Sequence, residues 1–250
     1  MKIVTLNTWG GRAGKENLLA FFEQYKDSVD IFCLQEIWRA PYEHLEGVDM
    51  TQVVTDGLQE ISRVLSDFQV FFHPHHQEDY GLATFVRSNR NVYEQGDYFV
   101  HKYKEYVPIG NVGKHARNIQ YIKIGEKENP LTVINFHGLW NGAGKEDTEE
   151  RILQSENIIQ FLKEQKGRIV FCGDFNLLPE TQSLRMMEDF GLHNLVREFG
   201  ITSTRTSFYT KPEKFADYIF TSSNVAVKDF QVLPEEVSDH AALLVEIEEN

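Results

Sequence analysis

Short runs rich in Val, Ile and Phe recur along the chain and are bounded by polar or turn-forming residues. Their length and β-branched content predict β-strands. The runs are Lys2–Leu6, Ile31–Leu34, Val70–Phe72, Leu82–Val86, Ile119–Ile124, Thr132–Phe136, Arg168–Cys172, Tyr218–Thr221 and Ala241–Ile247. No linker or low-complexity stretch separates them, so we expect one domain over residues 1–250.

Apolar residues at helical spacing lie between several of these runs. One helix is expected over Asn17–Tyr25 and another around Leu58–Leu65. The longest candidate is Thr148–Lys166, with Asp147 and Glu150 as its capping pair. Strands that alternate with helices predict an α/β protein.

The two halves of the chain repeat one arrangement of strand, helix and strand. Polar residues follow each of these strands: Asn7 after Ile3–Leu6, Gln35-Glu36 after Ile31–Leu34, His137 after Val133–Phe136, and Gly173-Asp174 after Ile169–Cys172. Strand ends are where α/β sheets usually place ligand sites. We therefore expect the chemistry of this protein at these positions.

Acids, amides and imidazoles at these positions form short strings. In Gly173-Asp174-Phe175-Asn176 an acid and an amide two residues apart point to the same side of an extended segment. Together they could grip a metal, a water or a phosphate, although the same string is typical of a turn or a helix cap. Asp239-His240 pairs an acid with an imidazole, which suits cation binding and proton transfer. Glu36 is an oxygen ligand of the kind that magnesium favours.

Bulk composition places the protein among globular chains, with 41% hydrophobic and 25% charged residues. No apolar run approaches the ~18 residues that suggest a membrane span, and the N-terminus lacks a signal peptide, which predicts a cytoplasmic protein. Cys33 and Cys172 lie in apolar runs outside any Cys-x-x-Cys pair, so we expect buried free thiols. We also expect a monomer.

Charge and glycine patterns exclude some functions. The net charge of −13 disfavours broad binding to duplex DNA. Bases nevertheless gather in Phe99–Ile124 and at Arg205, Lys211 and Lys214, either as a phosphate-facing patch or as solvated loops. Neither glycine-rich loop of the chain matches a P-loop or a dinucleotide fingerprint, so ATPase and dehydrogenase functions are not supported.

The polar strings, taken in order, resemble the endonuclease/exonuclease/phosphatase superfamily, which has the deoxyribonuclease-I-like fold. The matching strings are Leu6-Asn7-Thr8-Trp9, Leu34-Gln35-Glu36, Gly173-Asp174-Phe175-Asn176, Asp217-Tyr218-Ile219-Phe220 and Ser238-Asp239-His240. The resemblance implies a four-layer sandwich of two packed mixed β-sheets flanked by helices. It leaves the substrate open, because this superfamily cuts DNA, RNA, phosphoinositides, sphingomyelin and protein–nucleotide links.

The resemblance also implies a divalent metal. Glu36 looks like the principal magnesium ligand, helped by Asn7 and Asp239. So few protein ligands leave room for water and phosphate oxygens, as magnesium prefers. Manganese is an alternative, since it accepts oxygen ligands as well.

Catalytic roles follow from the same resemblance. Asp174 would orient or deprotonate the attacking water, and Asn176 would hold the phosphate or the nucleophile. His240, held by Asp217, would stabilise the phosphoryl oxygens or transfer a proton. His137 occupies a strand-end position that fits protonation of the leaving group.

Two arginines and an aromatic residue carry weaker expectations. Arg117 resembles a phosphate-contacting arginine of some members, with a plain surface residue as the alternative. Arg151 either folds toward the site or pairs with Asp147 or Glu150. We interpret Tyr80 as packing.

The remaining histidines and tryptophans suit structural roles. His73-Pro74-His75-His76 is expected in a loop, because its adjacent histidines share no face. His193 shows no partner in the sequence. Trp9 and Trp140 are expected to pack in the core or at a rim.

The sequence thus predicts a magnesium-dependent phosphoesterase that cuts a phosphodiester or a phosphomonoester. Its substrate is either a nucleic acid or a smaller, soluble or lipid-linked phosphate ester, and both endo- and exo-action stay open. The alternative from another class is a non-catalytic binding module that retains the fold. Every polar position that the chemistry requires is filled, which favours the enzyme.

Overall fold

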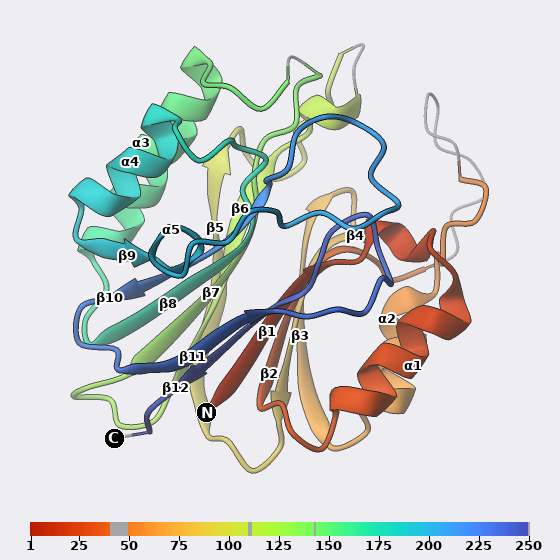
Figure 1. Cartoon of the computed structure of the whole chain (residues 1–250), viewed down its shortest axis with the longest axis horizontal. Coiled ribbons are helices and arrows are strands. Elements are labelled where there is room, and N and C mark those ends of the chain that lie inside the picture. The colour runs from red at the N-terminus through yellow and green to blue at the C-terminus, as the bar shows by residue number, and fades with distance from the viewer. Residues whose placement is uncertain (41–49, 110–111, 143, 250) are drawn as a thin grey trace.

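Two six-stranded β-sheets pack face to face in the computed structural model, which describes residues 1–40, 50–109, 112–142 and 144–249 (Figure 1). The first sheet has the order β11 (Val227–Val232), β12 (Leu243–Ile247), β1 (Lys2–Asn7), β2 (Ile31–Trp38), β4 (Tyr80–Arg87) and β3 (Phe68–His76). The second has the order β5 (Val92–His101), β6 (Arg117–Ile124), β7 (Leu131–His137), β8 (Arg168–Asp174), β10 (Asp217–Ser222) and β9 (Leu192–Asn194).

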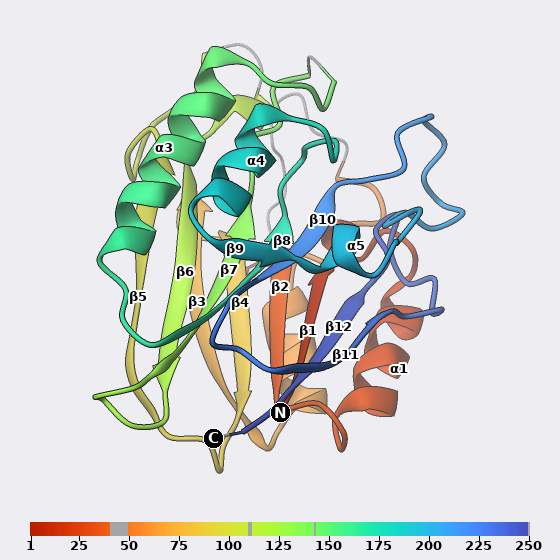
Figure 2. The ribbon, with the colours of Figure 1, turned by 60° about the vertical axis from the view of Figure 1, so that its left-hand side comes forward.

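Helices cover the outer face of each sheet. The first sheet carries α1 (Lys15–Tyr25) and α2 (Gly57–Val64), and the second carries α3 (Glu149–Lys163) and α4 (Gln182–Asp189), which lie in front of it in Figure 2. The short elements are η1 (Trp9–Gly11), η2 (Val112–Lys114) and α5 (Leu195–Glu198). These four layers confirm the predicted α/β sandwich. None of the helices in the described ranges is long and apolar enough to cross a membrane.

Each sheet is built around one parallel pair of strands. β1 pairs with β2 in parallel, with α1 between them in the chain, and β7 pairs with β8 in parallel, with α3 between them. The register sets Asn7 opposite Gln35 and His137 opposite Asp174. The predicted repeat of the two halves is therefore present, and it brings the polar strand ends to the same edge of each sheet.

Alternation along the strands divides the core into layers. Ile3 and Cys33 belong to the cluster that lies between the sheets, whereas Val4 and Phe32 belong to the cluster under α1 and α2. This is the period of two expected of a strand that is buried on both faces. Cys33 and Cys172 are both buried and free, as predicted.

Polar side chains also lie between the sheets, close to the strand ends. Gln35 Nε2 donates to Asn135 Oδ1 (2.7 Å), and Asn135 Nδ2 donates to Gln120 Oε1 (3.2 Å), which also accepts from Thr84 Oγ1 (2.7 Å). All four side chains are buried. Because a shifted register would leave these groups unpaired, the network helps to specify how one sheet sits on the other.

Three local predictions were wrong. Residues 73–76 are not a loop but the end of β3, where His75 Nδ1 bonds Asn118 Oδ1 (3.1 Å) and a register shift accommodates Pro74. Asp147 does not cap α3, because Thr148 does so; Asp147 instead accepts from the first backbone amides of α4. His193 has a partner, since its Nδ1 lies 2.7 Å from Glu198 Oε1.

The buried polar network should contribute measurably to stability. We expect Asn135→Ala to lower the free energy of unfolding by about 1–3 kcal/mol, because it leaves buried amide groups without partners. Denaturant unfolding measures the change, and Asn129→Ala, at an exposed position, is the matched control. Equal stability of the two variants would contradict a role for the network.

Candidate active site

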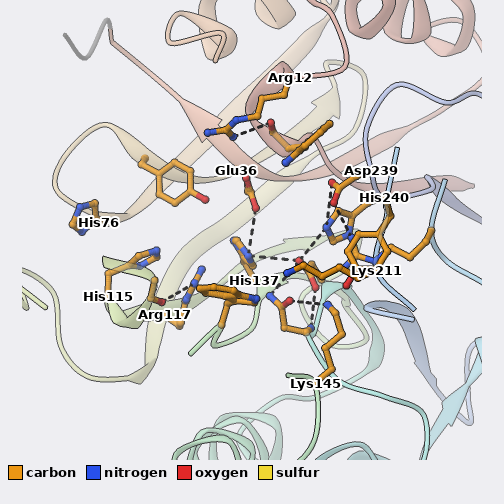
Figure 3. Close-up of a pocket in the computed structure, with 18 of the residues that line it drawn as sticks. Arg12, Glu36, His76, His115, Arg117, His137, Lys145, Lys211, Asp239 and His240 are labelled. Carbon is orange, nitrogen blue, oxygen red and sulfur yellow. Dashed lines mark hydrogen bonds and ion pairs between the residues drawn. The ribbon is translucent and has the colours of Figure 1, made fainter. Parts of the chain in front are cut away.

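One cavity of about 300 Å³ opens at the edge of the sandwich where the parallel strands end. Acidic and polar strand-end residues line it together with cations and aromatic rings from the surrounding loops (Figure 3). Of the residues predicted from the sequence, those that line the cavity are Glu36, Arg117, His137, Asp174, Asn176, Asp239 and His240. Asn7 and Asp217 lie beneath them and hydrogen-bond to members of this group.

Local backbone geometry aims two of these side chains. Glu36 sits in β2 at a register shift between Leu34 and Ile37 and has a φ of +59°. Asn176 has a φ of +56°. Such bulges and left-handed positions re-aim side chains and recur near functional sites. Gly173 is required by close packing, because a Cβ there would lie 2.0 Å from the carbonyl oxygen of Phe136.

The Asp174 carboxylate lies at the centre of the cluster. Its Oδ1 accepts from the backbone N–H of Asn176 (2.8 Å), and its Oδ2 accepts from Asn7 Nδ2 (2.9 Å). The same oxygen is 3.6 Å from His137 Nε2 and 3.7 Å from His240 Nε2. Burial alone would raise the pKa of Asp174, but His240 and nearby cations outweigh burial and lower it. Asp174 is therefore an ionised carboxylate within a buried site.

His240 and Asp217 form a buried pair next to Asp174. His240 Nδ1 lies 2.8 Å from Asp217 Oδ2, and Thr204 Oγ1 accepts from the backbone N–H of Asp217. Burial disfavours a charged imidazole, yet Asp217, Asp174 and Asp239 together raise the pKa of His240. The pKa of Asp217 is raised chiefly by its burial. The pair holds the imidazole with Nε2 toward Asp174 and Asp239.

His137 lies between Glu36 and Asp174, and its pKa is shifted in the opposite direction to that of His240. Its Nε2 is 3.9 Å from Glu36 Oε1, and burial, followed by the charge of Arg117, holds its pKa well below the usual range. His137 is therefore a neutral imidazole. A neutral ring can donate a hydrogen bond, but it has no extra proton to give to a leaving group.

Oxygen atoms suited to a cation face the cavity on the side of β2. The pKa of Glu36 is raised by burial and further by the charge of Asp239. Asp239 Oδ1 is buried and has no hydrogen-bond partner within the described ranges, while Oδ2 accepts from Arg205 Nη1 (3.3 Å). A cation between the two residues would offset the charge of the buried Glu36 carboxylate and give Asp239 Oδ1 the partner that it lacks. The residues thus fit a divalent metal.

Asn7 fits the metal site in a different way from the prediction. Its Nδ2 donates to Glu36 Oε1 (3.1 Å) and to Asp174 Oδ2, and its Oδ1 accepts from the backbone N–H of Trp9 (2.9 Å). The amide hydrogens, rather than the oxygen, face the carboxylates.

A second group of ligand atoms within 4.8 Å of one another comes from Asp174, Asp217 and His240.

Cations that the sequence did not mark as site residues line the opposite wall. Lys145 is buried and its Nζ donates to Asn176 Oδ1 (3.0 Å). Burial lowers the pKa of Lys145. Arg205 stacks 3.9 Å from the ring centroid of Tyr209, and Lys211 lines the cavity beside them. The basic group at residues 205–214 was a usable signal, whereas Lys145 lies in a glycine loop that matched no known phosphate motif.

The two predicted phosphate-contacting arginines differ in position. Arg117 is buried and lines the cavity. Arg151 is buried too, but it does not line the cavity, and its guanidinium donates to the backbone carbonyls of Leu139, Gly144 and Glu146. The expectation that Arg151 folds toward the site or pairs with Asp147 or Glu150 is corrected: it braces the loop between β7 and α3.

Aromatic side chains form much of the cavity lining. Trp9, Trp38, Tyr80, Trp140 and Tyr209 all face it. Tyr80, which was predicted to pack, therefore lines the cavity. So do Trp9 and Trp140, which were predicted to pack in the core or at a rim. Burial raises the pKa of Tyr80 far above its usual range, so its hydroxyl keeps its proton.

Comparison with known proteins identifies the family of this chain. The chain belongs to the Endonuclease/Exonuclease/phosphatase family, whose model matches residues 4–240. By its description, this family unites endonucleases, exonucleases and phosphatases, which all act on phosphate esters. The predicted family is confirmed.

Several solved structures share the fold across the whole chain. A family protein from Leptotrichia buccalis is 19% identical, with a TM-score of 0.74 and 100% of both chains covered. A mannosyl-6-phosphatase from Bacteroides thetaiotaomicron is 19% identical, with a TM-score of 0.71 and 100% of both chains covered. TDP2 of D. rerio, complexed with a single-strand DNA product, is 17% identical, with a TM-score of 0.70 and coverage of 100% of this chain and 99% of that one.

A curated relative matches only part of the chain. A UPF0294 protein from Vibrio campbellii is 32% identical over 115 residues, which cover 46% of this chain and 39% of that protein. The chain thus spans well under half the length of this relative. This partial match adds neither a family nor a substrate.

Arg151 offers a test of its structural assignment. We expect Arg151→Met to lower the free energy of unfolding by about 2–4 kcal/mol, because it leaves three backbone carbonyls without a charged donor. The KM of the remaining folded enzyme should stay within about twofold of the wild-type value, as expected for a residue without substrate contact. Arg63→Met, at an exposed helix position, is the control. A large rise in KM at unchanged stability would return Arg151 to the substrate site.

Proposed function

We propose that this chain is a magnesium-dependent phosphoesterase that hydrolyses a compact phosphate ester. One observation carries the proposal: His240, held by Asp217 from beneath, lines one cavity together with Asp174, Glu36 and Asp239. A charged imidazole, an ionised carboxylate and oxygen ligands for a cation are the parts that phosphoryl transfer to water needs.

The phosphoryl group would be held on the wall formed by β8 and its neighbouring loops. His240, whose pKa is raised, carries a proton on Nε2 and can donate it in a hydrogen bond to a phosphoryl oxygen. Lys145 and Asn176 lie 3.0 Å apart and provide further donors from the same side. Donors fixed before the reaction stabilise negative charge as it develops on these oxygens.

Asp174 is placed to act on the attacking water. Its lowered pKa keeps it ionised, and Asn7 and Asn176 hold its two oxygens in place. We propose that Asp174 orients the water and accepts its proton. His137, being neutral, would donate a hydrogen bond to the leaving oxygen instead of a proton.

Glu36 and Asp239 would hold the magnesium, with Asn7 positioning Glu36 through its amide hydrogens. When bound, the metal supplies positive charge to the phosphoryl oxygens and to the leaving oxygen. Manganese would fit the same oxygens.

The dimensions and charge of the molecule favour a small substrate over a long nucleic acid. The cavity of about 300 Å³ is at the lower end of ligand pockets, and the chain carries a net charge of −13. The fold alone is neutral on this point, because it is shared by the mannosyl-6-phosphatase and by TDP2 bound to DNA. A short nucleic-acid end that enters the cavity is the second candidate, supported by the aromatic lining.

A substrate panel tests the proposal. Purified protein with magnesium should hydrolyse soluble sugar and nucleotide phosphate esters. Its kcat/KM for them should be at least about tenfold above that for nicked, abasic, single-stranded or duplex nucleic acids. The reason is the small cavity within an acidic surface. Higher activity on any of the nucleic acids would favour the second candidate, and no hydrolysis of either group would remove the proposal.

Removal of the charged imidazole should abolish most of the activity. We expect His240→Ala to lower kcat by about 10²–10⁴-fold. The melting temperature should also fall, because Asp217 stays buried without its partner, so kcat is compared on protein shown to be folded. The matched control is His193→Ala, whose ring is exposed and remote from the cavity. Steady-state kinetics on the best substrate of the panel measures the effect, and wild-type kcat in His240→Ala would exclude the assigned role.

Metal binding can be tested without turnover. Magnesium should raise the melting temperature of the wild-type protein, because a ligand that binds only the folded state stabilises it. Glu36→Gln should raise the metal concentration at half effect by at least about tenfold, since the site loses a charged ligand. Glu128→Gln, which removes an exposed carboxylate, should leave it unchanged. Identical titrations of the three proteins would place the metal elsewhere.

A further inference from the structure

Arg117, at the start of β6, carries a buried guanidinium with unused donors. Its side chain is only 2% exposed, yet it lines the cavity. Nη2 donates to the carbonyl oxygen of Gly113 (3.2 Å), whereas Nε and Nη1 are buried and have no partner among the residues that the structure describes. Two buried nitrogens whose N–H groups have no acceptor are costly to keep and are ready for an acceptor that enters the cavity.

The nearby carboxylates are engaged with other groups. Asp174 accepts from Asn7 and from the backbone of Asn176, and Glu36 accepts from Asn7. Within the described part of the chain, Arg117 forms no ion pair with either acid. A buried cation without a counter-ion is a site for an anion, and the planar fork of a guanidinium suits a carboxylate or a phosphate.

Histidine rings form the wall around Arg117. His115 stacks on His75 at 5.0 Å and lies 5.0 Å from His76. Burial, followed by the charge of Arg117, lowers the pKa of His115 and of His76, so both rings are neutral. The wall adds no positive charge, and the burial of Arg117 strengthens its attraction for an anion.

Arg117 lies apart from the donors assigned to the scissile phosphate. Figure 3 shows Glu36 and His137 in the middle of the cavity, with Arg117, His115 and His76 to one side and with Lys145, Lys211 and His240 to the other. A single phosphate held at Asn176 and His240 therefore leaves the Arg117 side for another part of the substrate.

We propose that Arg117 forms a second anion subsite, which binds an anionic group on the leaving-group part of the substrate. The substrate is then a compact phosphate ester with a second negative group, either a carboxylate or another phosphate. The position of the scissile phosphate rests on the proposed function. The affinity of Arg117 for an anion does not, so the two can fail separately.

Anion binding tests the subsite directly. Calorimetric titration of the magnesium-loaded protein with inorganic phosphate should show two sites. Arg117→Met should lose one of them, with affinity at least tenfold weaker, and Lys145→Met should lose the other. Arg63→Met is the matched control and should keep both. An isotherm with one site, or two sites that survive Arg117→Met, would overturn the proposal.

A second arm separates the two kinds of anion. Acetate should compete with phosphate at the Arg117 site if a carboxylate is accepted there, whereas phosphate binding unaffected by acetate would assign the subsite to a second phosphate. The melting temperature of the Arg117→Met variant without phosphate is an independent test of the subsite. It should equal or exceed that of the wild type, because an unpaired buried charge is removed. A fall in melting temperature with an unchanged phosphate isotherm would make Arg117 purely structural.

Turnover distinguishes this inference from the proposed function. A sugar bisphosphate should have a kcat/KM at least tenfold above that of the matching sugar monophosphate in the wild type, and Arg117→Met should abolish the preference. Two phosphate sites without hydrolysis of any ester would remove the function and leave the subsite. Hydrolysis with one phosphate site and no preference would remove the subsite and leave the function.

Discussion

The hydrogen bond from Asn7 to Asp174 joins the two sheets at the floor of the cavity. Asn7 ends β1 of the first sheet, and Asp174 ends β8 of the second. The Asn7 amide also donates to Glu36, which lies at the register shift in β2. The active site exists only because these strand ends meet. The parallel register within each sheet and the Gln35–Asn135 contact between the sheets keep them aligned. A shift of either sheet would separate Glu36, a proposed metal ligand, from Asp174, the proposed base.

Charge is distributed so that the site can hold both a cation and an anion. The surface as a whole is acidic, with a net charge of −13, while the cavity sets its acids beside cations from the surrounding loops. Burial lowers the pKa of both His137 and His240, and the neighbouring charges make the difference. Three carboxylates raise the pKa of His240, whereas the charge of Arg117 lowers the pKa of His137 further. The pKa values of two imidazoles in one cavity are thereby shifted in opposite directions.

Much of the fold and of the central site could be predicted from the sequence, because strand-end polarity is local. Glu36, Asp174 and His240 were marked by their place after or before an apolar strand, and they meet in the structure. Edge strands such as β5 and β11 were missed, since their mixed exposure leaves little apolar pattern. Arg151 was misplaced because a helix-surface spacing argument cannot show that a guanidinium turns toward backbone carbonyls.

By itself the sequence determined the family, the α/β architecture and the chemical types at the strand ends, because each depends on short-range periodicity and on motifs that keep their order. Only the tertiary structure decided which atoms of Asn7 face the acids, that Lys145 reaches Asn176, and that Arg117 is buried with unused donors. These facts depend on contacts between segments that are distant in the sequence. Packing and burial determine both the contacts and the protonation of the groups within them, and no local pattern encodes either.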